Sequence, residues 1–232
     1  MQLVLFDLDH TLIPFDSGST WFRYLMRRGV LDAADFEAQN RQFAEDYIAG
    51  KLDIAAFQRF CMSVLARYAR ADLDGWRSDF IAEIGAQVPE AGRALVRHHL
   101  DAGDLCCIVT ATNHYVAGAF AEIFGVPHLV ASQARTEQGD PRGRFTGEMD
   151  GIASFGAGKV PRVADWLAIL GHDWDSFERS VFYSDSANDL PLLNHVSDPV
   201  VVSPDTRLRA EATERGWPVF DTLEAVCEYA LA

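Results

Sequence analysis

Short apolar runs recur along the chain, and each of them stops abruptly at a polar residue. They occupy residues 3–6, 105–109, 128–131, 181–183 and 200–202. A continuous apolar run of this length is typical of a strand that is buried on both faces, as strands are in a parallel sheet. We therefore predict five strands of such a sheet.

Helical patterns lie between these runs. Apolar residues recur every three or four positions over residues 90–100, 115–124 and 160–170. Each segment is followed by a glycine that suits the residue just past a helix end. Strands that alternate with helices indicate βαβ units. The predicted fold is α/β, with a doubly wound parallel sheet and a Rossmann-like core.

Residues 17–85 interrupt this alternation. Segments 21–28, 33–49 and 54–70 have helix-like apolar spacing, and no strand pattern occurs among them. We predict a helical cap domain of residues 17–85, inserted after the first strand into a core of residues 1–16 and 86–232. Aromatic residues at helical spacing are expected to fill mainly the cap interior, with one or two facing a substrate. They are Trp21, Phe22, Tyr24, Phe36, Phe43, Tyr47, Phe57 and Phe60.

Two further segments carry predictions about the surface. Residues 137–151 are rich in Gly, Asp and Arg, which favours a surface excursion with a hairpin at residues 144–147. The adjacent pair His98 and His99 lies in a helical pattern, and we expect both side chains at the surface.

The charge balance restricts the classes of partner. The 232 residues include 34 acidic and 20 basic side chains, a net charge of −14. Such a chain repels nucleic acid and anionic lipid, so we expect neither partner. No apolar stretch reaches the roughly 18 residues of a membrane span, and the first residues read as a strand. We expect a cytoplasmic protein whose four cysteines, which lack CxxC spacing, are reduced core residues. The pattern does not indicate an oligomeric state.

Polar residues follow the predicted strands where the carboxyl ends of parallel strands meet, which is where ligands bind in open α/β sheets. These residues are Asp7, Asp9, Thr110, Asp185 and Asp189, with Lys159 opening a helix on the same rim. Clustered carboxylates repel each other and lose hydration, and a bound cation relieves both costs. Because the donors are hard oxygens, they favour Mg²⁺ over zinc.

Four short motifs occur along the chain in the order expected for one known superfamily. Asp7-x-Asp9-x-Thr11, a strand ending in Thr110, Lys159, and Ser184-Asp185-x-x-Asn188-Asp189 resemble the four motifs of the haloacid dehalogenase-like phosphohydrolase superfamily. The resemblance spans nearly the whole chain. The helical insertion resembles the cap of the phosphoserine phosphatase-like branch. Residues 183–193 are similar to a histidinol-phosphatase-like bacterial subgroup.

The resemblance implies three catalytic residues. Asp7 is expected to attack phosphorus and form an aspartyl-phosphate, which divides one difficult displacement into two easier ones. Asp9 is expected to protonate the leaving alkoxide and then to deprotonate water. Lys159 is expected to neutralise the nucleophile and the phosphoryl charge, which a strongly acidic chain must do locally.

The resemblance also implies metal ligands. Asp7, the main-chain carbonyl of Asp9 and Asp185 are expected to hold Mg²⁺. Asp189 is expected to support the same ion, either directly or through water.

The remaining motif residues are expected to contact phosphate. Thr110 supplies a hydroxyl, and Ala111 supplies a main-chain N–H at the start of a helix. Asn188 either orients the carboxylates or touches the phosphate.

Two residues depart from the phosphoserine phosphatase pattern. His10 stands where that pattern commonly has serine, and we expect a partly exposed turn residue. Asp16 stands where the branch typically places a glutamate that reads the substrate's amino group. Asp16 either binds a substrate ammonium or caps the helix that starts near Ser17.

The sequence thus predicts hydrolysis of a small phosphorylated metabolite. The resemblance points to amino-alcohol phosphates such as histidinol phosphate or phosphoserine. Two alternatives stay open at this point: a phosphotransferase or mutase that uses the same intermediate, and a non-catalytic binding module with the same fold.

Overall fold

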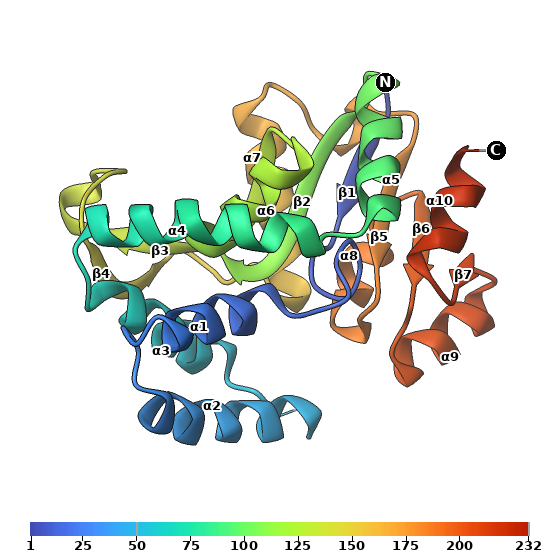
Figure 1. Ribbon diagram of the computed structural model, residues 1–232. Coiled ribbons are helices and arrows are strands. Elements are labelled where there is room, and N and C mark those ends of the chain that lie inside the picture. The colour runs from blue at the N-terminus through green and yellow to red at the C-terminus, as the bar shows by residue number, and fades with distance from the viewer. Residues whose placement is uncertain (50, 232) are drawn as a thin grey trace.

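The computed structural model describes residues 1–49 and 51–231, apart from the side chains at positions 35, 44, 47 and 48. The prediction for the Tyr47 ring therefore lies outside the described residues. Over the described ranges, seven strands form one sheet in the order β4-β3-β2-β1-β5-β6-β7 (Figure 1). The strands are β1 (Leu3–Phe6), β2 (Leu105–Asn113), β3 (His128–Thr136), β4 (Phe145–Asp150), β5 (Ser180–Ser184), β6 (Asp198–Val202) and β7 (Val219–Phe220).

The path of the chain through the sheet creates a switch point beside β1. From β1 the chain moves outward through β2 and β3, and it later returns to β5 on the opposite side of β1. All neighbouring strands are parallel except β3 and β4. The loops after β1 and β5 leave in opposite directions and open a crevice there. The predicted doubly wound α/β fold is confirmed.

Helices cover both faces of the sheet. They are α5 (Glu90–Asp101), α6 (His114–Phe124), α7 (Lys159–Ile169), α8 (Leu190–Leu193), α9 (Thr206–Arg215) and α10 (Leu223–Leu231). Val4 and Phe6 of β1 belong to the buried cluster that includes α5 and α6. Leu3 and Leu5 belong to the cluster that includes α7 and α9. This two-residue alternation between two covered faces explains why β1 is apolar throughout.

The insertion after β1 is helical wherever the structure describes it. Its helices are α1 (Ser17–Arg27), α2 (Ala33–Ile48), α3 (Ile54–Ala66) and α4 (Arg70–Ile84). The third predicted helix ran to residue 70, which was wrong, because the chain leaves helical geometry at Ala69. Helix α4 was missed, because its buried apolar residues are only Leu73, Phe80 and Ile84.

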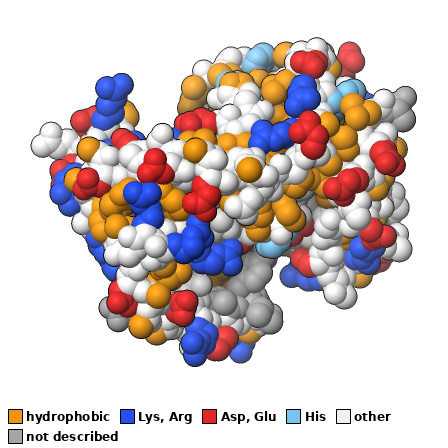
Figure 2. Space-filling view, viewed as in Figure 1, with side chains coloured by type: hydrophobic (Ala, Val, Ile, Leu, Met, Phe, Trp, Pro, Cys, Tyr) orange, Lys and Arg blue, Asp and Glu red, His pale blue; other side chains and the backbone are white. Residues whose placement is uncertain are grey.

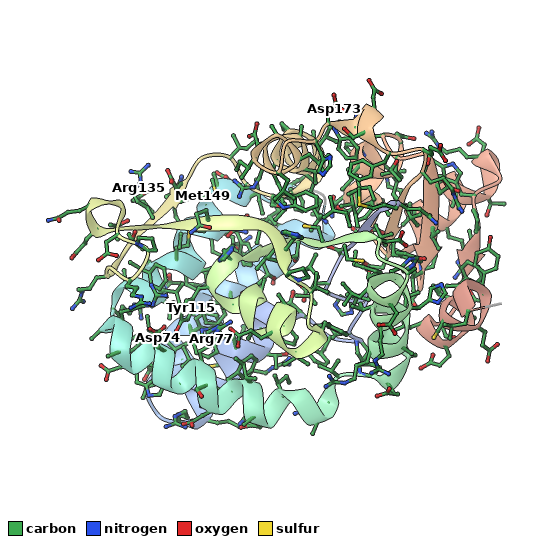
Figure 3. The ribbon with its side chains drawn as sticks, turned by 90° about the horizontal axis from the view of Figure 1, so that it is seen from above. Asp74, Arg77, Tyr115, Arg135, Met149 and Asp173 are labelled. Carbon is green, nitrogen blue, oxygen red and sulfur yellow. The ribbon has the colours of Figure 1, made fainter. Side chains whose placement is uncertain are left out.

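Helix α4 packs against α6 through hydrogen bonds of polar side chains. Tyr115 Oη donates to Asp74 Oδ1 at 3.0 Å, and Arg77 Nε donates to the Tyr115 carbonyl at 3.0 Å (Figure 3). One buried apolar cluster runs from the sheet into α1, α3 and α4. The division into a core of residues 1–16 and 86–232 and a cap of residues 17–85 remains a proposal.

The predicted hairpin is displaced along the chain. Residues 137–144 form the connection between β3 and β4, whereas Phe145, Thr146 and Gly147 lie within β4. Gly147 has a φ of +86°, and a Cβ there would lie 3.4 Å from Ser63 Cα of α3. Strand β4 therefore packs against a helix of the insertion.

The prediction that His99 lies at the surface was wrong. Its side chain is buried, with Nδ1 3.1 Å from Asp104 Oδ2 and Nε2 2.9 Å from Tyr183 Oη. The four cysteines are free and buried, as expected.

The surface carries charges of both signs. On the face shown in Figure 2, acidic side chains are spread over the whole view with basic ones between them. Across residues 1–49 and 51–231, no helix combines the length and apolarity needed to cross a membrane.

Candidate active site

Asp7 lies at the carboxyl end of β1, at the centre of the sheet. Its N–H donates to the Tyr183 carbonyl at 2.9 Å, which continues the β1–β5 ladder by one residue. Its carboxylate is buried, and Oδ1 accepts from Lys159 Nζ at 2.8 Å. This contact joins two residues that are 152 positions apart in the sequence.

Lys159 is the first residue of α7 and reaches two carboxylates. Besides Asp7, its ammonium lies 2.7 and 2.8 Å from the two oxygens of Asp189. Asp189 Oδ2 also accepts from Ser184 Oγ at 2.8 Å. Gly158, just before Lys159, permits this approach, because a Cβ there would lie 2.3 Å from the Ala153 carbonyl oxygen.

The charges in this cluster shift one another's ionisation. Burial raises the pKa of Asp7 to about 6, although the Lys159 ammonium lowers it. Burial alone would lower the pKa of Lys159, but the carboxylates of Asp189 and Asp7 together raise it above its ordinary value. At neutral pH Lys159 is therefore charged, and Asp7 is largely ionised and able to act as a nucleophile.

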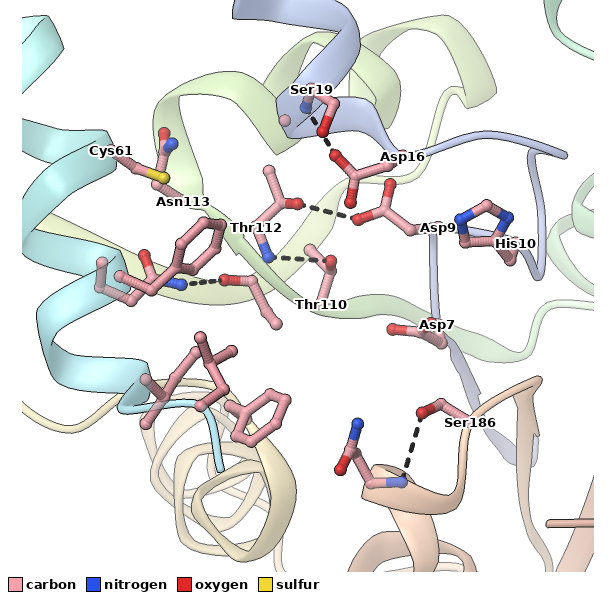
Figure 4. Close-up of a pocket in the computed structure, with 18 of the residues that line it drawn as sticks. Asp7, Asp9, His10, Asp16, Ser19, Cys61, Thr110, Thr112, Asn113 and Ser186 are labelled. Atoms are coloured by element: carbon pink, nitrogen blue, oxygen red, sulfur yellow. Dashed lines mark hydrogen bonds between the residues drawn. The ribbon is translucent and has the colours of Figure 1, made fainter. Parts of the chain in front are cut away.

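Asp9 is held by two hydrogen bonds that aim its carboxyl group. Oδ1 accepts from the Ser17 N–H at 2.7 Å. Oδ2 accepts from Thr112 Oγ1 at 2.9 Å (Figure 4). Burial, followed by the negative charge of Asp16, raises the pKa of Asp9 to about 8. Its carboxyl is therefore mostly protonated at neutral pH, as a proton donor must be.

His10 occupies a left-handed turn between Asp9 and Thr11. Its φ is +58°, and the Leu8 carbonyl accepts from the N–H groups of Thr11, Leu12 and Ile13. The side chain is exposed, which confirms a turn residue.

Asp185 follows β5 and faces Asp7 across the switch point. Its Oδ1 accepts from Thr11 Oγ1 at 3.1 Å, and its carbonyl accepts from the Asp205 N–H at 2.9 Å. Burial, then the charges of Asp7 and Asp189, raise the pKa of Asp185 to about 8. Among the described residues, no Lys, Arg or His forms an ion pair with it.

These donors fit a hard divalent cation. Asp7 is buried and Asp185 is partly buried, and the charge of Asp7 disfavours the charged form of Asp185. A cation between the two carboxyl groups would remove that cost. In the described ranges, no three His, Cys, Asp or Glu side chains are arranged to hold a metal by themselves. Two carboxylates with a main-chain carbonyl and waters suit Mg²⁺, which keeps several waters, better than zinc.

The phosphate-binding prediction needs one correction. Ala111 does not start a helix, because β2 continues to Asn113 and α6 begins at His114. Thr110 pairs with Ala131, whereas Asn113 pairs with the next residue, Ser132. Ala111 and Thr112 therefore form a bulge at the end of β2.

The bulge directs several polar groups at the site. Thr110 Oγ1 accepts from the Thr112 N–H at 3.2 Å, while Thr112 itself holds Asp9. The Ala111 carbonyl accepts from Gln58 Nε2 of α3 at 2.7 Å. The bulge thus connects the core to the insertion beside Thr110, which is the kind of position where bulges re-aim side chains.

Asp16 acts as an N-cap. Its Oδ1 accepts from the Ser19 N–H at 2.5 Å at the start of α1, and its side chain is exposed (Figure 4). Capping uses Oδ1 of Asp16. A role of Asp16 in binding a substrate ammonium is therefore compatible with its role as the N-cap.

A cavity of about 400 Å³ joins all of these residues. Its polar end is formed by the sequence-predicted site residues, namely Asp7, Asp9, Thr110, Ala111, Lys159, Asp185, Asn188 and Asp189, and Asp16 and His10 also line it. The opposite wall comes from α1, α2 and α3. The structure therefore brings every predicted site residue to one cavity.

Several other residues that shape the site were assigned no role from the sequence, although Thr11 and Ser184 belong to its motifs. Thr112 and Ser17 hold Asp9, Thr11 holds Asp185, and Ser184 holds Asp189. The Thr-Ala-Thr-Asn run at the end of β2 was a usable signal for Thr112. Gln58 had a fainter one, as a polar residue on the buried stripe of α3.

The fold and the site together define an α/β enzyme whose cavity holds a buried carboxylate paired with a lysine and, beside them, several further carboxyl groups. The chain belongs to the haloacid dehalogenase-like hydrolase family, whose model matches residues 4–194. The resemblance of the four motifs is thereby confirmed.

Known relatives cover nearly the whole chain. A histidinol-phosphatase from Neisseria meningitidis is 42% identical over 221 residues, which are 95% of this chain and 98% of that protein. The structure of a protein of unknown function from Bordetella pertussis Tohama I is 41% identical, with a TM-score of 0.88 over 95% of this chain and 98% of that one. A substrate-bound phosphoserine phosphatase shares the fold at 17% identity, with a TM-score of 0.67 over 98% and 97% of the two chains.

Proposed function

We propose that this protein is a Mg²⁺-dependent phosphatase that hydrolyses a small phosphomonoester through an aspartyl-phosphate on Asp7. The observation that carries the proposal is the buried contact of Asp7 with Lys159 at 2.8 Å, beside a separately held carboxyl group, Asp9. This arrangement separates an ionised nucleophile from a protonated acid, which is the division of roles that phosphoryl transfer to a carboxylate requires.

The steps follow from the positions of the side chains. Asp7 attacks phosphorus, while Asp9 gives its proton to the departing alkoxide oxygen. The ionised Asp9 then takes a proton from water, which attacks the aspartyl-phosphate and regenerates Asp7. Lys159 neutralises negative charge on the phosphoryl oxygens during both displacements.

Thr110 and Asn188 line the same end of the cavity and are proposed to hydrogen-bond the phosphoryl oxygens. Ala111 lends its main-chain N–H to this group from the bulge rather than from a helix start.

Asp7, Asp185 and the Asp9 carbonyl are proposed to hold the Mg²⁺ ion. When bound, the ion supplies positive charge to the phosphoryl group and orients it for in-line attack. Asp189 is proposed to support the ion indirectly, because its oxygens are engaged by Lys159 and Ser184. Residues 17–85 are proposed to act as a cap that excludes bulk water from the nucleophile.

The names of relatives suggest the substrate class. They include a histidinol-phosphatase and phosphoserine phosphatases, so phosphorylated amino alcohols and amino acids are the first substrates to test. A phosphotransferase or mutase would share the same intermediate. A non-catalytic module is disfavoured, because nucleophile, acid and lysine are all present.

The test is a screen of phosphorylated metabolites with Mg²⁺, run in parallel on the wild type and on Asp7→Asn. We expect phosphate release that disappears in the variant and on addition of EDTA. Added acceptor alcohols distinguish hydrolysis from phosphotransfer, because a transferase would yield a new phosphoester. Turnover that persists in Asp7→Asn would rule out the aspartyl-phosphate.

A further inference from the structure

The cavity is strongly asymmetric in charge. Lys159 is the only Lys or Arg side chain among the described residues that line it, and it is committed to the phosphate end by its contacts with Asp7 and Asp189. The far wall carries apolar side chains from α1, α2, α3 and the segment before α3, namely Phe22, Phe43, Leu52, Ile54 and Phe57. Asp16, a further acidic side chain, also lines the cavity. A substrate carboxylate would therefore lose its hydration here without meeting a lysine or arginine among the described lining residues.

Gln58 is a buried polar side chain in this far wall. It is 2% exposed, and its Nε2 donates to the Ala111 carbonyl at 2.7 Å. A carbonyl oxygen can only accept, so this contact fixes which end of the amide is the NH₂ group. The other end of the amide is then the acceptor Oε1.

The Oε1 atom of Gln58 lacks a hydrogen-bond donor. It is shielded from solvent and has no partner among the described residues, although the side chain lines the cavity. Buried acceptors in folded proteins nearly always have a donor, so an orphan on a side chain that lines a ligand cavity is well explained by a donor on the ligand. The fixed Nε2 contact holds this acceptor ready before any substrate arrives.

We propose that Gln58 is a specificity-determining residue whose Oε1 accepts a hydrogen bond from an N–H group on the alcohol part of the substrate. The cavity then takes a phosphomonoester whose alcohol part bears such an N–H and an apolar or aromatic group, but no carboxylate. This inference rests on the proposed phosphatase function and narrows its substrate class. The apolar wall packs against the carbon skeleton, and Gln58 accepts from the N–H. Because the described lining offers no second lysine or arginine, acids are disfavoured.

The first arm of the test uses wild-type enzyme with Mg²⁺ and a matched pair of substrates. Phosphoethanolamine and phosphoserine differ only by the carboxylate. We expect kcat/KM to be higher for phosphoethanolamine. A clear preference for phosphoserine would overturn the exclusion of carboxylates.

The second arm compares histidinol phosphate, which has N–H donors, with 4-nitrophenyl phosphate, which has none. Gln58→Met keeps the side-chain length and removes the acceptor. It should lower the ratio of kcat/KM for histidinol phosphate to kcat/KM for 4-nitrophenyl phosphate by roughly two- to ten-fold, the range for one lost hydrogen bond, whatever the loss of the Ala111 anchor costs on both substrates. An equal loss on both substrates would mean that Gln58 only anchors Ala111, and would overturn the proposal.

Gln58→Glu is the conservative variant. A buried carboxyl group stays protonated, so it can donate to the Ala111 carbonyl and keep a free acceptor. Its selectivity should match the wild type, and loss of the selectivity in a folded Gln58→Glu protein contradicts the proposal. If wild-type enzyme turns over neither substrate, the phosphatase function itself fails. If the wild type hydrolyses 4-nitrophenyl phosphate but Gln58→Met leaves its selectivity between the two substrates unchanged, the phosphatase function stands and only the role of Gln58 fails.

Discussion

Replacing Lys159 by methionine removes a charge that two buried carboxylates share. The ammonium lies 2.8 Å from Asp7 Oδ1 and 2.7 Å from Asp189 Oδ1, and its side chain is 3% exposed. Breaking a buried ion pair by deleting one partner typically costs about 3–5 kcal/mol, because the other charge stays buried and unpaired. For a chain of this size that corresponds to a fall in Tm of very roughly 10 °C. Loss of one preorganised charge in the site should also lower kcat by about 10²–10³.

The stability loss should depend on pH with a definite sign. Without the lysine, the pKa of Asp7 in the folded state lies above the value of about 6 that it has beside Lys159. A carboxyl whose folded pKa exceeds its unfolded value binds more protons when folded, so its unfavourable contribution grows as pH rises through the folded pKa. We expect the difference in unfolding free energy between wild type and Lys159→Met to be small near pH 5 and largest near pH 8.

The assay is urea unfolding followed by circular dichroism, in EDTA, at several pH values. A matched variant, Lys159→Met with Asp189→Asn, removes one orphaned charge and keeps an acceptor for Ser184. It should regain part of the stability and none of the activity. A loss below about 1 kcal/mol that does not change with pH would refute the reasoning, since it would mean that water reaches the pair and screens it.

The remaining predictions concern proton donation, packing and a buried histidine. Because Asp9 must hold its proton, kcat/KM should fall as pH rises through about 8, and Asp9→Asn should abolish that descending limb and lower the rate by about 10²–10⁴. Gly158→Ala places a Cβ 2.3 Å from a carbonyl oxygen and should cost about 1–3 kcal/mol in urea unfolding. Gly75→Ala, in open space on α4, is its control and should be neutral or stabilising by up to about 1 kcal/mol. Burial lowers the pKa of His99, so its contribution to stability is present above its unfolded pKa and is lost as pH falls through the folded value. The urea midpoint should therefore drop between pH 7 and pH 5 more in wild type than in His99→Gln.

Each of these three predictions would be contradicted by a specific result. A pH–rate profile that is the same in Asp9→Asn excludes this carboxyl as the acid. Equal stabilities of Gly158→Ala and Gly75→Ala would mean that the backbone before α7 shifts at little cost to accommodate the new Cβ. A His99→Gln protein that loses stability in parallel with wild type on acidification assigns that loss to other groups.

The sequence by itself determined which residues meet at the site. Asp7, Thr110 and Asp185 each follow a buried apolar run, and parallel strands necessarily bring their carboxyl ends to one edge. Lys159 could be added because it opens a helix after a glycine-rich turn. These predictions depend on local patterns and on a rule of topology, so they do not require knowledge of how any side chain packs.

Only the tertiary structure decided how those residues are held. The bulge at Ala111 and Thr112 arises from the register between β2 and β3, which no local pattern specifies. In the sequence, Gln58 and His99 are ordinary polar residues of helical segments. Their partners, the Ala111 carbonyl for Gln58 and the Tyr183 hydroxyl for His99, come from distant parts of the chain. Burial and hydrogen-bond partners are properties of long-range packing. For that reason the sequence could predict which residues line the cavity, but not which contacts support them.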